Sequence, residues 1–100
     1  MPDSVQSVQG FAVRLSDERW NHILLEHAEL AGLRESVLET VASPERVLQG
    51  GAGEMLAVSE FEAGKFLIVV YRDAEDGFVI TAFLTRRAAS LGRRRTVWPL

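Results

Sequence analysis

Two strongly apolar stretches separated by a short polar loop constrain the fold of this 100-residue chain more than any other feature. The first, residues 65–72, is rich in β-branched and aromatic side chains, which favour strands. The second, residues 78–85, follows after the polar loop 73–77, which ends in glycine. Two such runs joined by a short glycine-containing loop are typical of a β-hairpin. The sequence therefore predicts an antiparallel strand pair at the centre of a sheet.

The expected register of this hairpin places Tyr71 opposite Val79 and Lys65 opposite Thr85. Side chains of like parity then share a face, and the even-numbered face is wholly apolar. We expect helices over that face and a shallow binding surface on the other, with four polar side chains: Lys65, Tyr71, Thr81 and Thr85. Thr81 and Tyr71 also have ordinary structural explanations, since threonine favours strands and tyrosine often borders a core.

The segment before the hairpin has the periodicity of amphipathic helices. Ser16 can cap a helix through its hydroxyl, and a stripe of side chains follows at spacings of three and four: Trp20, Ile23, Leu24 and His27. Gly32 interrupts this stripe, and a second helical pattern over 33–41 ends before Pro44. Two short helices are predicted, and each needs a sheet to cover its apolar face.

Three more strands are predicted around the hairpin. Residues 11–15 alternate between apolar and polar, residues 54–61 follow a glycine-rich turn, and residues 93–98 have the weak alternation of an edge strand. Residues 1–10 are polar and aperiodic, so we expect a flexible leader there and a single domain over 11–100. The expected fold class is α+β, with an N-terminal short strand and two helices packed on a four-stranded antiparallel sheet.

Composition excludes several kinds of site. The chain has no cysteine, which excludes disulfides and thiolate metal sites. No apolar run approaches the roughly 20 residues of a membrane-spanning helix, and the polar start lacks the features of a signal peptide. The two histidines have no carboxylates at helical spacing to both. We therefore expect a cytoplasmic protein with no metal and no cofactor.

Charge is distributed unevenly along the chain. The net charge is −7 over residues 1–63 and +4 over residues 64–100, which accounts for the total of −3. Five arginines of the basic part fall within ten positions: Arg86, Arg87, Arg93, Arg94 and Arg95. Such a cluster is either a solvated loop and edge strand or a surface for phosphate groups or an acidic partner. The residue pattern leaves both interpretations open.

His27 is the first catalytic candidate, because it is the titratable group on the apolar face of the first predicted helix. Histidine titrates near neutral pH and is a common general acid or base. A histidine on such a face is more often a packed core residue, so this alternative stands beside the catalytic one. Glu26 and Glu29 flank His27 and either orient its ring or only solvate the helix. His22 is expected to face solvent.

Four short motifs together resemble a known family. They are Trp20-Asn-His-Ile-Leu-Leu-Glu-His-Ala-Glu-Leu30, Ser43-Pro44, Lys65-Phe-Leu-Ile-Val-Val-Tyr71 and Val79-Ile-Thr-Ala-Phe-Leu-Thr85. The combination is similar to the phage-associated nuclease-like domains grouped with the barnase, EndoU, colicin E5/D and RelE toxins, and it runs from about residue 16 to residue 98. The first motif departs from the family's common His-Pro-Glu, because Ala28 stands in place of proline.

The resemblance implies a RelE- or barnase-like fold and a metal-independent ribonuclease or toxin without a cofactor. Such cleavage of RNA needs a base for the 2′-hydroxyl, an acid for the leaving oxygen and cations that hold the phosphate. The catalytic residues would be His27, Tyr71 and Thr81. The phosphate- or RNA-binding residues would be Lys65, Arg72, Arg86, Arg87, Arg93, Arg94 and Arg95. RNA and a neutralising or larger phage protein are the partners that it implies.

Two other classes stay open beside this hypothesis. An inactive relative of the fold would bind RNA or a protein through the arginine cluster without breaking a bond. A structural or assembly module would instead pair its exposed strand edges with another chain. All three classes therefore stand as alternatives.

Overall fold

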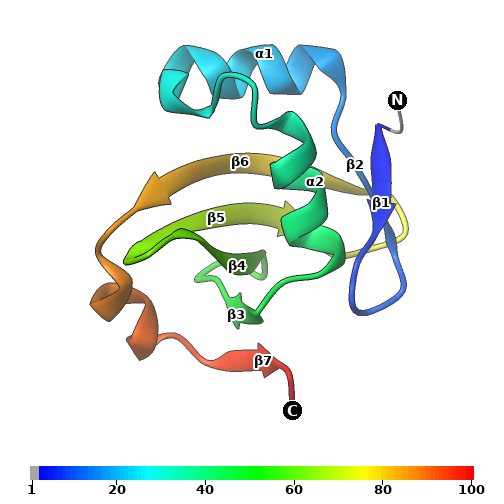
Figure 1. The fold of residues 1–100 in the computed structure, drawn as a ribbon. Helices are drawn as coiled ribbons and strands as arrows, with labels where there is room; N and C mark the ends of the chain where they lie inside the picture. The colour runs from blue at the N-terminus through cyan, green and yellow to red at the C-terminus, as the bar shows by residue number, and fades with distance from the viewer. Residues whose placement is uncertain (1–2) are drawn as a thin grey trace.

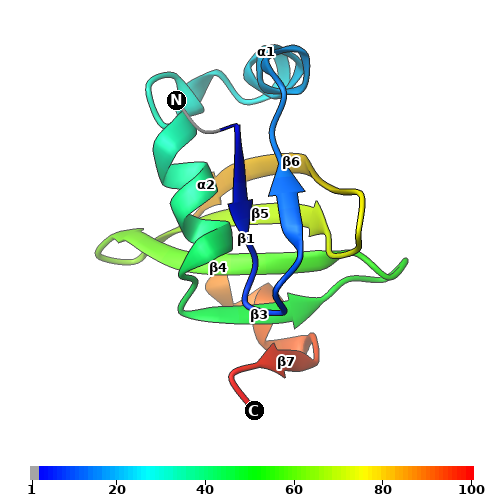
Figure 2. The ribbon, with the colours of Figure 1, turned by 90° about the vertical axis from the view of Figure 1, so that its right-hand side faces the viewer.

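The computed structural model describes residues 3–100, and all of their side chains except those of residues 88–90. In this part of the chain, seven strands form one curled sheet in the order β1-β2-β6-β5-β4-β3-β7 (Figures 1 and 2). The strands are β1 (Ser4–Gln6), β2 (Ala12–Arg14), β3 (Arg46–Gln49), β4 (Met55–Glu62), β5 (Lys65–Arg72), β6 (Gly77–Thr85) and β7 (Thr96–Trp98). The helices are α1 (Asp17–Glu26) and α2 (Arg34–Ala42), and two 3-10 turns are η1 (Ala28–Leu30) and η2 (Ala88–Arg93).

The predicted four-stranded antiparallel sheet of RelE or barnase type is wrong. The observed sheet has seven strands among the described residues, and it is mixed because β2 runs parallel to β6. Two of its strands, β1 and β3, come from segments without a strand signal. Strand β1 pairs with β2, and β3 lies between β4 and β7. Each is only three or four residues long, which is too short for a two-residue period to stand out.

The expected flexible leader therefore contributes a strand to the sheet. Residues 4–6 form β1, and Ser7 is buried and donates a hydrogen bond from its Oγ to the Asp73 carboxylate at 2.7 Å. This bond ties the N-terminal segment to the loop after β5. Residues 1–2 of the expected leader lie outside the described residues.

The central hairpin forms where it was predicted, but its register changes along its length. Tyr71 lies opposite Val79, as expected. A bulge follows, and beyond it Val70 lies opposite Thr81. The expected partner of Thr81 was Val69, so the remainder of the hairpin is shifted by one residue. An extra residue in one strand is invisible in the sequence here, because residues 78–80 are all apolar.

The predicted assignment of the two hairpin faces is reversed in β5, whereas beyond the bulge Ala82 and Leu84 of β6 face the helices, as predicted. The odd-numbered side chains of β5, from Leu67 to Tyr71, belong to the core beneath α1 and α2. The even-numbered side chains of β5 belong to a second core on the other side, which Leu91 of η2 helps to close. In place of the expected shallow binding surface, the structure has two covered faces, and Tyr71 is fully buried.

The two predicted helices are confirmed. The Ser16 hydroxyl caps α1 by accepting a hydrogen bond of 3.0 Å from the Arg19 backbone N–H. Trp20 and Ile23 of the predicted stripe are buried. The helix ends at Glu26, and His27 is its C-cap with a non-helical φ of −136°, so His27 departs from that stripe. Within the described residues, no helix combines the length and the apolar character that crossing a membrane requires.

Gly77 begins β6 at a point where the backbone is crowded. An added Cβ would lie 2.5 Å from the carbonyl oxygen of Arg72 and 3.1 Å from that of Ala12. A glycine at the end of a hairpin loop commonly supplies a positive φ, but Gly77 is not among the residues with positive φ. Glycine is required here because no side chain fits. The close approach lets β2 pair with β6 and places Arg14 beside Phe78.

Candidate functional site

Helix α1 lies alongside β6, and the two run in the same direction (Figure 1). Where they begin, Ser16 and Arg19 line a hollow together with residues of β6. Where they end, the ring centroids of His27 and Phe83 lie 6.0 Å apart. A helix of ten residues is about 15 Å long. The α1–β6 side, as we call these two elements and the residues around them, therefore has two ends with different chemistry.

His27 occupies the far end of the α1–β6 side. Its side chain is 30% exposed, and its Nδ1 lies 3.6 Å from the Oε2 of Glu29. Its ring is inclined by 35° to that of Phe83. Of the two carboxylates that flank His27 in the sequence, Glu29 is the one close enough to orient the imidazole. A partly exposed imidazole held in this way can exchange a proton with a ligand that reaches it.

Thr81 lies on the same strand as Phe83, two residues earlier, so the two side chains share a face of β6. Its Oγ1 is buried and has no hydrogen-bond partner among the described residues. A buried hydroxyl without a partner costs stability. The structure thus brings Thr81 onto the strand against which His27 packs.

Tyr71 is separated from solvent by the core beneath the helices. It is fully buried, and its hydroxyl has no partner within the described part of the chain. Burial, with a smaller contribution from the charge of Asp73, raises the pKa of the Tyr71 hydroxyl above its ordinary value. The phenol stays protonated and does not reach the surface on which His27 lies.

The predicted phosphate-binding residues are divided among three places. Lys65 begins β5 and Arg86 follows β6, so both flank the end of the hairpin nearer to Phe83, where the Arg87 N–H donates to the Thr85 hydroxyl. Arg72 lies opposite Phe78 at the other end. The arginine run, Arg93 to Arg95, is exposed and leads from the last residue of η2 to the start of β7, at the opposite end of the molecule from α1 (Figure 1). These cations do not converge on one cleft.

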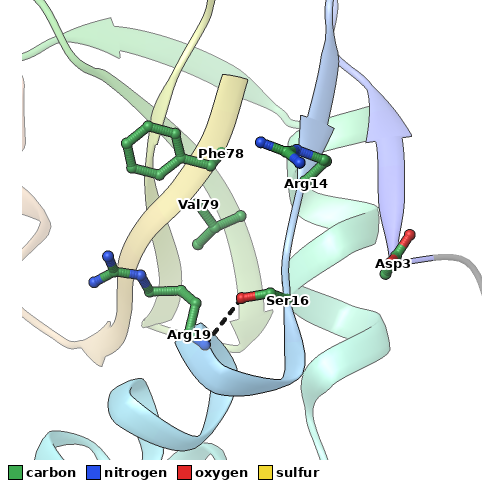
Figure 3. A pocket seen from close by; sticks show the side chains of 6 residues that line it. All are labelled: Asp3, Arg14, Ser16, Arg19, Phe78 and Val79. Atoms are coloured by element: carbon green, nitrogen blue, oxygen red, sulfur yellow. Dashed lines mark hydrogen bonds between the residues drawn. The ribbon is translucent and has the colours of Figure 1, made fainter. Parts of the chain in front are cut away.

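A hollow of about 350 Å³ lies where β2, α1 and the start of β6 meet (Figure 3). Its lining residues are Asp3, Arg14, Ser16, Arg19, Phe78 and Val79, and we call it the Arg14–Arg19 hollow. In this view Arg14 lies to the right of Phe78, Arg19 lies below Phe78, and Val79 lies between the two arginine side chains. Neither guanidinium has an ion pair or hydrogen bond with any of the described residues.

Arg34 of α2 fixes the junction between β2 and α1. Its Nη2 donates a hydrogen bond of 2.8 Å to the Leu15 carbonyl oxygen, and its Nη1 pairs with the Asp17 carboxylate. Together with the Ser16 cap, these contacts hold the backbone from which Arg14 and Arg19 project. The two guanidiniums are therefore carried on a braced strand-to-helix turn.

The sequence patterns did not indicate the Arg14–Arg19 hollow. Both arginines belong to the part of the chain with a net charge of −7, which drew attention to the basic C-terminal part instead. The one sequence feature that could have indicated the hollow is the position of the two arginines on either side of Ser16, which caps the helix after a strand. No group of three histidine or carboxylate side chains in the described part of the chain is arranged to hold a metal.

Comparison with protein-family models, with curated proteins and with solved structures gave no match to this chain.

Proposed function

We propose that this chain is a small RNA-acting domain that cleaves RNA without a metal, with His27 as its proton-transferring group. The observation that carries the proposal is the partly exposed His27 imidazole, held between the Glu29 carboxylate and the Phe83 ring. The resemblance of the His27 and Thr81 motifs to nuclease-like domains agrees with it.

The reaction that this chemistry supports is an internal transfer within RNA. The 2′-hydroxyl attacks the neighbouring phosphorus, and the bond from phosphorus to the 5′-oxygen of the next nucleotide breaks. One proton leaves the attacking hydroxyl and one joins the leaving oxygen, so the step consumes no net proton, electron or water. His27 serves as the base or the acid, a role that typically contributes about 10²–10⁴-fold to the rate.

Charge on the phosphate is balanced by cations at the same end of the hairpin. Lys65 and Arg86 flank this end, and both are candidates to hold the phosphate as negative charge develops. Thr81 lies two residues before Phe83 on the same strand, but its buried Oγ1 does not reach the surface and makes no direct contact with RNA in this site. Tyr71 and the arginine run have no part in this site.

The test is cleavage of a single-stranded oligoribonucleotide in EDTA, with products identified by mass spectrometry. We expect a 2′,3′-cyclic phosphate and a 5′-hydroxyl, and a loss of at least about a hundredfold in His27→Ala. His22→Ala is the matched control, because it removes an exposed histidine from the same helix and should keep the wild-type rate. Equal cleavage by His27→Ala and wild type, or no cleavage by wild type, would contradict the proposal.

A second function, RNA binding without cleavage, is favoured by the exposure of the arginine run far from His27. Binding through this run would weaken as salt rises, because phosphate contacts release counterions. Substituting the run by glutamine should then lower the slope of log affinity against log salt by about 0.7 for each phosphate that the run neutralises in the wild type. An unchanged slope would exclude the run as the RNA-binding surface.

A further inference from the structure

We propose that the Arg14–Arg19 hollow binds one nucleotide of RNA, with the phosphate held by the arginines that line it and the base against the Phe78 ring. The inference rests on the proposed function in taking RNA as the ligand. It goes further by assigning a binding subsite, distinct from His27, to residues that the reaction itself does not use.

The phosphate half of the proposal follows from the two arginines. Arg14 comes from β2 and Arg19 from α1, and both line one hollow without a partner among the described residues. Guanidinium groups match phosphate oxygens with two parallel hydrogen bonds, and both arginines attract an anion that enters the hollow. Asp3 is the one acidic residue in the lining, so the hollow keeps a net positive charge.

The base half follows from the rest of the lining. Phe78 lines the same hollow as the two arginines, and nucleobases stack on aromatic side chains without strong sequence preference. The Ser16 Oγ accepts a hydrogen bond from the Arg19 N–H, which leaves the hydroxyl hydrogen available to a ligand oxygen. The volume of about 350 Å³ is within the usual range for small-molecule sites.

The hollow and His27 lie at the two ends of α1, about 15 Å apart along the helix. A single nucleotide in the hollow therefore does not touch His27, whereas a longer strand laid along α1 and β6 meets both. The hollow would hold RNA on one side of the bond that is cleaved. Its loss should raise KM for a long substrate more than it lowers kcat.

The experiment is a titration of the full chain with adenosine 5′-monophosphate, followed by calorimetry and by NMR of the backbone amides. We expect binding that shifts the amides around Ser16 and Phe78. The double variant Arg14→Gln/Arg19→Gln should bind at least about tenfold more weakly. Arg46→Gln is the control, because Arg46 lies on β3, outside the hollow and outside the arginine run, and this variant should bind as wild type does.

Two further ligands separate the parts of the site. Inorganic phosphate should bind wild type more weakly than the nucleotide and should be insensitive to Phe78→Leu, whereas the nucleotide should lose affinity in that variant. Adenosine alone should bind more weakly than the nucleotide. Nucleotide affinity unchanged in the double variant, or equal affinities for adenosine and the nucleotide, would overturn the proposal. Phe78→Leu supplies the test should the double variant fail to fold.

The outcomes also separate this inference from the proposed function. His27→Ala should bind the nucleotide as wild type does, because the hollow does not include His27. Nucleotide binding in the hollow by a chain that cleaves no RNA would support the subsite and contradict the nuclease. RNA cleavage by a chain that binds no nucleotide would support the nuclease and contradict the subsite.

Discussion

The α1–β6 side and the end of the molecule formed by η2 and β7 both carry arginines, but they present them differently. Arg93, Arg94 and Arg95 follow one another and are exposed. Arg14 and Arg19 are separated in the sequence, yet they line one hollow with Phe78. Consecutive side chains of an extended segment point to opposite sides, whereas a strand-to-helix turn brings separated ones together. Charge density along a chain is therefore a poorer guide to a site than convergence in space.

The largest effect we expect concerns how firmly η2 is held. Leu91 is buried in the second core, so Leu91→Ala should lower the free energy of unfolding by about 2–5 kcal/mol. Leu25 is 85% exposed, and Leu25→Ala should change stability little. Chemical denaturation measures both. A negligible effect of Leu91→Ala would mean that η2 is not fixed to the sheet. The arginine run would then not be held away from the Arg14–Arg19 hollow.

The next effect concerns Thr81 on the α1–β6 side. Thr81→Val keeps the shape of the side chain and removes a buried hydroxyl that has no partner among the described residues. Stability should therefore be unchanged or slightly higher. Cleavage should be unaffected, because the buried hydroxyl does not reach RNA. A loss of cleavage without a loss of stability would make Thr81 a residue that orients RNA.

A comparable effect is expected for Tyr71, which lies in the core beneath the helices. Tyr71→Phe removes another buried hydroxyl without a partner in the described part of the chain, and should stabilise the protein by about 1 kcal/mol. Cleavage should be unaffected, because the phenol does not reach the surface. A large loss of cleavage without loss of stability would restore Tyr71 as a catalytic residue.

The burial of Tyr71 can also be tested at alkaline pH, where a tyrosine ionises; stability at neutral pH is not affected by this ionisation. Burial raises the pKa of Tyr71 in the folded chain, so the unfolded chain ionises its tyrosine first. The free energy of unfolding should therefore be unaffected by this group below the ordinary tyrosine pKa of about 10 and should fall as pH rises above it. Tyr71 is the single tyrosine, so its ultraviolet absorbance reports its ionisation directly. Ionisation of the folded protein with a midpoint near pH 10 would contradict its burial.

The helices and the central hairpin were predictable because each has a strong local signal. Ser16 marks the start of α1, and the apolar run of β5 is long enough to identify a strand. The strands β1 and β3 are too short to show a period, and the bulge before Tyr71 leaves no trace in an apolar run. One extra residue was enough to shift the partners of β6 along most of the hairpin.

The candidate site was predictable only in part. His27 was identified by its type and position, but its partial exposure depends on the end of α1 at Glu26, one residue before His27. The Arg14–Arg19 hollow depends on β2 reaching β6, which in turn needs the missing side chain of Gly77. Such contacts between segments far apart in the sequence have no local signature.

The most direct test of the account is to map where RNA lies on the full chain. An oligoribonucleotide with 2′-O-methyl groups cannot undergo the internal transfer, so it can be titrated and followed by NMR of the backbone amides. We expect shifts along the α1–β6 side, from Ser16 and Phe78 at one end to His27 and Phe83 at the other. Shifts confined to η2, the arginine run and β7 would contradict it.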